Sequence, residues 1–468
     1  MSVSKIHKNY QTQLPKWEKM QDVLAGQDAV KAKRTLYLPM CNCDDTSKEN
    51  LERYDAFLKR AVFLEATKET LSTHVGIAFA EDPEFDPDGL DFLSYDANGA
   101  GVSIYQIAQQ ALGKQLVFGK CGVLVDYPDI DTSKVSQAEK EMLALRATTV
   151  LYEAQAIVNW RVQKIGAEHK LVLLVLKERA LKVDPADEFS EEEIDQYRVL
   201  RLDEQGYSVQ LYQEDQPTTE KMYPKQATGK TFDKIPFQVI GSQHNTFNVN
   251  EIPLEPLANI NLAHYRNSAE YENSIFHVGQ VQPYMTNLSE EWRDHLEKTG
   301  VKIGSGYVML LPEGGTFGFA QAEPNMIAKE GMDDKLALMR AMGAKLLEPS
   351  ATNKTATQVD EEAITQHSVL SLCVANLNEA FENILQWVAM FEGKGFNAKF
   401  SVKQDFAVGK LSLEYMRFLW DLVVAGKMSD ETFHEILYSG KLPELDHEME
   451  LLRLEMQQDG TLRQNVVE

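Results

Sequence analysis

The feature that most constrains the fold is an apolar stripe with a seven-residue repeat between residues 363 and 391. This spacing places the apolar side chains on one face of a helix. The helix is predicted to run from about Thr355 to Phe391 and to span roughly 50 Å at 1.5 Å per residue. Such a helix is typically a spine against which other elements or other subunits pack. The repeat comprises Ala363, Leu370, Leu377, Ile384 and Phe391, with Val374, Phe381 and Val388 beside it.

A segment of small and polar residues precedes this stripe, in the stretch LLEPSATNKTATQVDEEA at residues 346–363. An apolar helix predicted over residues 325–347 ends where the segment begins. Ser, Ala, Thr, Asn and Lys bury almost no apolar surface, so we predict that the segment is mobile on a surface or in an opening.

The N-terminal half predicts a mixture of helices and strands. Residues 1–75 favour helices, with 51–71 forming one amphipathic helix. A further helix precedes a buried strand at 121–128, which Pro128 ends. Short runs of β-branched and aromatic residues between 150 and 245 predict a small barrel-like or sandwich sheet. These runs are AIVNWRVQ, KLVLLVLKERA, YRVLRLD, YSVQLYQ and IPFQVIG.

A second organisation begins at Pro253. Residues 254–280 predict one long helix, and 283–323 predict a compact segment with a short helix. In that segment, YVMLLPEGGTFGFAQ predicts two strands around a Gly-Gly turn. A strand at 397–406 and a small helical tail follow the spine helix. The sequence therefore predicts the α+β class.

Bulk composition limits the function. The formal net charge is −24, so most of the surface repels polyanions, whereas a protein that grips DNA tightly is basic. Four cysteines in 468 residues are too few for a disulfide framework. The sequence shows neither a signal peptide nor an apolar run long enough to span a membrane, so we expect synthesis inside the cell.

Two motifs resemble catalytic sites without meeting their requirements. The stretch ATGKTFD at 227–233 contains Gly-Lys-Thr, but the first glycine of a phosphate loop is missing before it. It predicts a polar hairpin. The acidic stretch DYPDIDTS at 126–133 has no supporting His or Lys nearby and predicts a solvated turn. We therefore expect no catalytic residue, no metal and no cofactor.

The order of these segments resembles the portal proteins of tailed bacteriophages. The resemblance covers roughly residues 10–400, and no single motif is diagnostic. The matching stretches are YLP, YDAFLKRAVFLEATKETL, GVLVDYP, EAQAIVNWR, YRVLRLD, IPFQVIG, PLANINLAHYRNSAEYENSIFHVGQVQPY and TATQ.

The resemblance implies a portal-type fold: an α/β wing, a two-helix stem, a small β-containing clip, a long spine helix and a short helical crown. Such chains form ring oligomers, typically of twelve subunits. The implied segments are 1–253 (N-terminal wing), 254–282 (first stem helix), 283–323 (clip), 324–346 (second stem helix), 347–357 (tunnel loop), 358–406 (wing helix and strand) and 407–468 (crown).

The resemblance also implies the functional residues. The tunnel loop and stem are expected to line a DNA channel, and the clip to dock other proteins. The implied channel residues are Arg340, Lys345, Glu348, Ser350, Thr352, Asn353 and Lys354. The implied docking residues are Tyr307, Met309, Glu313, Gly314 and Gly315.

As a portal, the chain would be a structural virion protein at one capsid vertex, made in the host cytoplasm and without a membrane partner. Implied partners are double-stranded DNA, bound non-specifically during packaging and ejection, the terminase large subunit, a neck or adaptor protein, and the major capsid and scaffolding proteins. Two alternatives remain: a metal-dependent nuclease of phage DNA metabolism, and another neck or adaptor ring protein.

Overall fold

The computed structural model contains two compact units, residues 1–404 and 405–468. The structure describes residues 2–40, 42–128, 142, 145–184, 187–280, 282–301, 310–320, 326–346, 368–404 and 420. The predicted helical tail therefore lies outside the described residues, apart from Trp420. The following description concerns the first unit.

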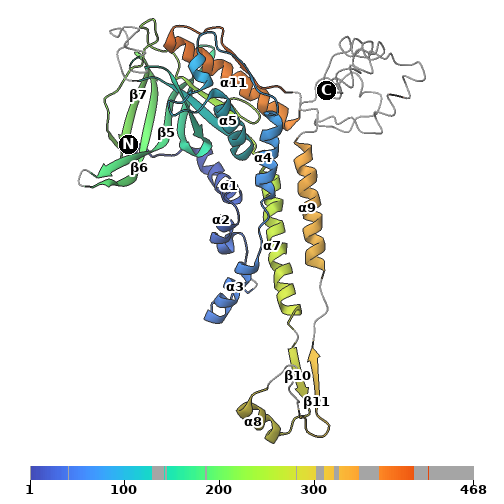
Figure 1. The fold of residues 1–468 in the computed structure, drawn as a ribbon. Coiled ribbons are helices and arrows are strands. Elements are labelled where there is room, and N and C mark those ends of the chain that lie inside the picture. Colours follow the sequence, from blue (N-terminus) through green and yellow to red (C-terminus); the bar gives the residue numbers. More distant parts are fainter. Residues whose placement is uncertain are drawn as a thin grey trace, which may run out of the picture. The chain divides into compact units, whose positions relative to one another are not determined.

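The core of the first unit is a three-stranded antiparallel sheet covered by two helices (Figure 1). The strand order is β3-β2-β9, with β2 at Lys120–Asp126, β3 at Thr148–Glu153 and β9 at Phe237–Gly241. Helix α5 (Ile104–Phe118) and helix α11 (Val369–Glu392) pack on this sheet and on each other. A capping box at Ser103 begins α5, and Gly119, with φ of 75°, ends it. The predicted buried strand at 121–128 is thus the central strand of this core.

Helix α11 carries the heptad stripe, and the buried spine is confirmed. All stripe residues from Leu370 to Phe391 are buried. The predicted start at Thr355 is wrong, because Ser368 is extended (φ −66°, ψ 161°) and its side chain accepts a hydrogen bond from the Ser371 amide. Serine is a strong N-cap for this reason. The helix has 24 residues and spans roughly 36 Å; Ala363 lies outside the described residues.

A second sheet has five antiparallel strands in sequential order, β4-β5-β6-β7-β8. The sheet is open, so the predicted barrel or sandwich is wrong. IPFQVIG forms β9 of the other sheet, and β8 has only two residues and ends at Pro217, which cannot donate to a further strand. The strands are β4 (Ile157–Ile165), β5 (Glu168–Asp184), β6 (Asp187–Asp203), β7 (Gly206–Gln213) and β8 (Gln216–Pro217).

The N-terminal helices pack mainly against α5 and against the long helix at Glu255–Val278. The single helix predicted over 51–71 is wrong, because α3 ends at Arg60 and α4 begins at Ala66. Between them, the Val62 amide donates to Ser268 Oγ at 3.2 Å and the Phe63 amide donates to Gln27 Oε1 at 3.1 Å. These bonds replace helical ones and allow Phe63 to enter the core. The helices are α1 (Lys8–Ala25), α2 (Gln27–Ala32), α3 (Lys48–Arg60) and α4 (Ala66–Ala78).

A long helical hairpin leaves this body and returns to it. It comprises α7 (Glu255–Val278), β10 (Gln282–Thr286), α8 (Glu290–Thr299), β11 (Thr316–Ala320) and α9 (Ile327–Lys345). The predicted helix, compact segment and return helix are therefore observed. Strand β11 pairs with β10, whereas most of the strand predicted before the Gly-Gly turn lies outside the described residues. The short strands β1 (Glu84–Asp86) and β12 (Lys399–Ser401) pair in the body.

Candidate functional site

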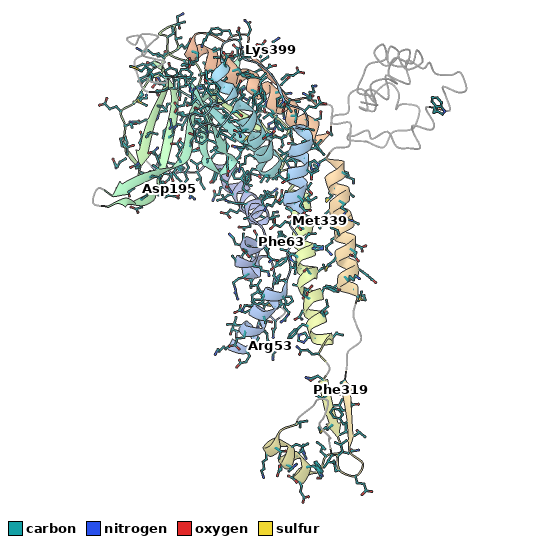
Figure 2. The ribbon with its side chains drawn as sticks, in the orientation of Figure 1. Arg53, Phe63, Asp195, Phe319, Met339 and Lys399 are labelled. Atoms are coloured by element: carbon teal, nitrogen blue, oxygen red, sulfur yellow. The ribbon has the colours of Figure 1, made fainter. Side chains whose placement is uncertain are left out.

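Helices α7 and α9 run side by side as the two arms of the hairpin (Figure 1). Glycines allow the close approach. A Cβ at Gly331 would lie 2.5 Å from Asn267 Nδ2 on α7, and one at Gly343 would lie 3.5 Å from Thr70 Cγ2 on α4. Met339, labelled in Figure 2, is buried between these contacts. The C-terminal half of α9 is therefore fixed against both α7 and the body.

Polar side chains hold the first half of α7 in the body. Asn261 Nδ2 donates to Thr67 Oγ1 at 3.2 Å, and both side chains are buried. His264 is also buried, and its Nδ1 has no hydrogen-bond partner. Burial lowers the pKa of His264, and the nearby Lys335 lowers it further, while Asp333 opposes the shift. A neutral imidazole is the form that this interface favours.

The distal part of the hairpin has no core of its own. Among the described residues from Tyr271 to Leu338, no side chain is buried. Helix α8 has no buried residue, and neither β10 nor β11 has one. Ile327 is 74% exposed and Leu310 is 72% exposed. Other exposed apolar side chains here are Ile275, Phe276, Tyr284, Val301, Phe319, Met326 and Leu338. An apolar surface of this extent is typical of one that contacts other chains.

The two ends of the described chain that flank residues 347–367 lie next to each other. The Leu370 amide donates to the Leu346 carbonyl at 3.1 Å, which joins the end of α9 to the first turn of α11. His74 Nε2 lies 2.9 Å from the Gly343 carbonyl and its Nδ1 lies 2.6 Å from the Thr70 carbonyl. The base of the segment is thus anchored on α4 and α11, whereas the segment itself lies outside the described residues.

Two of the predicted channel residues can be placed. Arg340 and Lys345 are exposed on the C-terminal half of α9 and make no ion pair within the described part of the chain. The exposed acidic residues of α9 lie nearer its start, at Glu330, Asp333 and Asp334. Lys329 is also exposed near the start, so the net exposed charge of α9 changes from negative there to positive at Arg340 and Lys345. The predicted residues Glu348, Ser350, Thr352, Asn353 and Lys354 lie outside the described residues.

The predicted docking residues lie partly in a turn before β11. The Gly315 amide donates to the Pro312 carbonyl at 2.8 Å, and Gly314 has a φ of 78° that favours glycine. Glu313 is exposed in this turn, and Asn287 Nδ2 donates to the Gly314 carbonyl at 3.2 Å. The Gly-Gly turn is confirmed. Tyr307 and Met309 lie outside the described residues.

The structure gives each of the two motifs considered for catalysis a structural role. In ATGKTFD, Lys225 and Thr231 form an isolated antiparallel bridge, and the Gly229 amide donates to the Gln226 carbonyl at 2.8 Å. The polar hairpin is confirmed. Within the described residues, no group of three His, Cys, Asp or Glu side chains could hold a metal ion. No helix there is long and apolar enough to cross a membrane.

Asp126 departs from the predicted solvated turn. Arg198 Nη1 donates to Asp126 Oδ2 at 2.7 Å, and Arg198 Nε donates to Glu178 Oε1 at 2.7 Å. Burial raises the pKa of Asp126, while the Arg198 charge opposes that shift. Burial also raises the pKa of Tyr152, whose hydroxyl donates to Glu178. This ionic group joins the two sheets. Nothing in the sequence indicated this ionic group, because its members lie on separate strands. The other two acids of the stretch, Asp129 and Asp131, lie outside the described residues.

A family model described as a domain of unknown function, DUF4055, matches residues 253–392, which run from the start of α7 to the end of α11. No curated protein matches the chain.

Solved structures of particle components do match. A chain from the virion of a native gene transfer agent particle is 15% identical, with a TM-score of 0.38 over 81% of this chain and 90% of that one. A chain from the neck of the empty particle, computed with C6 symmetry, is 14% identical, with a TM-score of 0.39 over 83% and 93%. One from the neck of the native particle, computed with C12 symmetry, is 14% identical, with a TM-score of 0.38 over 80% and 89%.

Two of these chains come from the neck of a particle and one from a virion, and all three TM-scores are below 0.5.

Proposed function

We propose that the protein is the portal of a tailed bacteriophage: a ring at one capsid vertex through which double-stranded DNA is packaged and ejected. One observation supports this most directly. A helical hairpin extends from a well-packed body, and between Tyr271 and Leu338 none of its described side chains is buried. Apolar surface of this kind requires a partner. Copies of the same hairpin arranged around an axis would cover it.

In this proposal α7 and α9 are the stem, residues 283–323 are the clip and residues 347–357 are the tunnel loop. The body, with α11 as its spine, is the wing, and 407–468 is the crown. The anchored ends of segment 347–367, held by the Leu370–Leu346 bond, support a loop that returns to its starting point. Small polar side chains would let such a loop follow a passing duplex without adhering to it.

The charge distribution suits transit of DNA. A ring repeats each Lys–phosphate contact once per subunit, so a strongly basic channel would hold the duplex in place. This chain has a net charge of −24, and the exposed cations in the C-terminal half of α9 are Arg340 and Lys345. A mainly acidic channel with a few cationic rings would centre the duplex and let it slide.

We further propose that the protein is not an enzyme and that a separate terminase supplies ATP hydrolysis. The clip, including Glu313 and its glycine turn, would bind the terminase large subunit and later a neck or adaptor protein. Both partners need the outward end of the channel, so they should compete for one ring. Simultaneous binding of both would contradict this assignment. The capsid and scaffolding proteins would surround the ring.

Negative-stain imaging of the purified protein tests the assembly. We expect rings with a central hole, and their symmetry would give the subunit number. A monodisperse monomer at micromolar concentration would contradict the proposal. Divalent-cation-dependent DNA cleavage by the same preparation would instead favour the nuclease.

Deletion of Ser350–Lys354 tests the channel loop. Ring assembly should persist, because few apolar contacts are lost, whereas packaging or retention of the genome should fail. Lys345→Glu should weaken DNA contact in a salt-dependent manner, with Lys329→Glu at the other end of α9 as the matched control. Normal packaging by the deletion variant would show that the loop is only a connector.

A further inference from the structure

The hairpin of β5 and β6 is longer than the sheet to which it belongs. Each strand has 17 residues. Strand β4 pairs with β5 only as far as Leu176, and β7 pairs with β6 only from Gln196 onward. The strands between Lys177 and Asp195 pair only with each other, and Figure 1 shows them extending past the sheet as a two-stranded ribbon. Residues 177–184 and 187–195 are called the ribbon below; Asp195 lies at its base in Figure 2.

The ribbon is acidic, and no other described strand pairs with its outer edges. It contains eight acidic and three basic residues. Two of the bases are already paired within the ribbon, Lys177 with Asp195 and Arg179 with Glu193, both at 2.7 Å. Glu191 and Glu192 are exposed and make no ion pair in the described part of the chain. A lone two-stranded ribbon is marginally stable in water, and free strand edges accept further strands.

Strand β4, an edge strand of the same sheet, has a free edge with the opposite charge. The first half of β4 is covered by the N-terminal segment: the His7 amide donates to the Val158 carbonyl at 2.9 Å, and Asn159 Nδ2 donates to the Lys5 carbonyl at 2.8 Å. The second half, residues 161–165, has β5 on one side and no described segment on the other. All five of its residues are exposed.

This free half of β4 is basic and partly apolar. Arg161 and Lys164 make no ion pair among the described residues, and Val162 and Ile165 are 42% and 47% exposed. Lys164 pairs with His169 near the start of β5, whereas the ribbon lies near its end. Glu192 pairs with Lys182 near the end of β5, so at about 3.3 Å per residue the side chains of Lys164 and Glu192 are roughly 40 Å apart along that strand. They cannot meet within one chain.

We propose that the acidic ribbon of one copy adds as a strand to the basic free edge of β4, residues 161–165, in the neighbouring copy. The inference rests on the proposed ring, since head-to-tail contacts between two different patches are what generate rings. Two ribbons repel each other because both are acidic, so the charges disfavour ribbon–ribbon pairing and favour ribbon–β4 pairing. Main-chain hydrogen bonds would supply affinity, and the charges would set the register.

A charge exchange tests the contact, with mass photometry of assembly as the readout. Glu191→Lys with Glu192→Lys should raise the subunit concentration at half assembly by about tenfold, and Arg161→Glu with Lys164→Glu should do the same. Combining all four substitutions should restore assembly toward the wild-type value. Glu214→Lys with Glu220→Lys is the matched control and should have little effect, because it reverses two exposed acids that flank β8 of the same sheet and make no ion pair among the described residues.

A shortened ribbon gives a second test that does not depend on charge. Replacing residues 181–193 by Asn-Gly keeps the Ala180–Ile194 pair and closes it with a favoured two-residue turn. The monomer should unfold at the wild-type temperature, and ring assembly should be impaired. Normal assembly by this variant, or no rescue by the fourfold exchange, would overturn the contact. Absence of rings from the wild-type protein would instead overturn the proposed function.

Discussion

The body and the distal hairpin of the same unit differ in whether their apolar side chains are buried. In α11, every stripe residue from Leu370 to Phe391 is buried, and α5 and β2 surround it with other buried apolar side chains. From Tyr271 to Leu338, no described side chain is buried, although Ile275, Phe276 and Phe319 are large and apolar. The body can therefore fold as a single chain, whereas the hairpin needs neighbouring molecules to cover it.

This difference separates two kinds of mutational effect. Substitutions in the body should change the free energy of unfolding of the monomer, since the removed contacts are internal. Substitutions in the distal hairpin should leave monomer unfolding almost unchanged and should alter assembly. The predictions below are ordered from the largest expected effect to the smallest.

Leu377→Asp should prevent folding of the body. Leu377 is fully buried on α11, and an unpaired charge there costs several kcal/mol, comparable to the whole stability of a domain. Soluble yield and ring formation should both be lost. Leu372→Asp, at a position 38% exposed on the same helix, is the matched control and should remain soluble. Normal rings from Leu377→Asp would refute the role of α11 as the spine.

Arg198→Met should destabilise the body by about 3 kcal/mol, because it leaves Asp126 and Glu178 without their shared cation. Chemical denaturation of the monomer measures this loss. Rings that form from the folded fraction should have normal symmetry, since the ionic group lies between the two sheets of one chain. A loss below 1 kcal/mol would show that water replaces the guanidinium at little cost.

Phe319→Asp should impair assembly without destabilising the monomer. Phe319 is 54% exposed on β11. Its ring lies edge-to-face with that of Phe317, with 5.0 Å between the ring centres. A charge there would oppose burial against a neighbouring copy. Phe396→Asp, at a comparably exposed phenylalanine of the body, is the control. Equal loss of rings from both variants would remove the distinction between the two regions.

Lys120 gives a pH-dependent test of the body alone. Its side chain is buried, with Nζ 4.4 Å from the Trp160 ring centre, and burial lowers its pKa from 10.5 to about 8. Between these values the folded state binds fewer protons than the unfolded state, so this group adds stability as the pH rises from about 8 toward 10.5. The stability of wild type relative to Lys120→Met should rise by about 2 kcal/mol between pH 7.5 and pH 10.

Urea denaturation at both pH values measures that difference. Lys8→Met, at an exposed lysine of α1, controls for loss of a positive charge. A relative stability independent of pH would mean that water reaches the Lys120 ammonium.

Periodicity predicted the elements with strong local signals. The heptad stripe identified the buried face of α11, and the long apolar patterns identified α7 and α9. The break at Ala61–Glu65 was not predictable, because the bonds from Val62 to Ser268 and from Phe63 to Gln27 join residues far apart in sequence. The barrel prediction failed for a similar reason, as β9 pairs with β2. Of the site, the Gly-Gly turn had a local signal, whereas the Asp126 ion pairs had none.

The central claim is that neighbouring copies cover the distal hairpin. Hydroxyl-radical footprinting of the wild-type protein, as isolated rings and as the dissociated monomer, measures this directly. We expect the side chains of Ile275, Phe276, Phe319, Ile327 and Leu338 to be several-fold less oxidised in the ring. The exposed body residues Phe396 and Tyr95 should be oxidised equally in both states. Equal oxidation of the hairpin in ring and monomer would contradict the account.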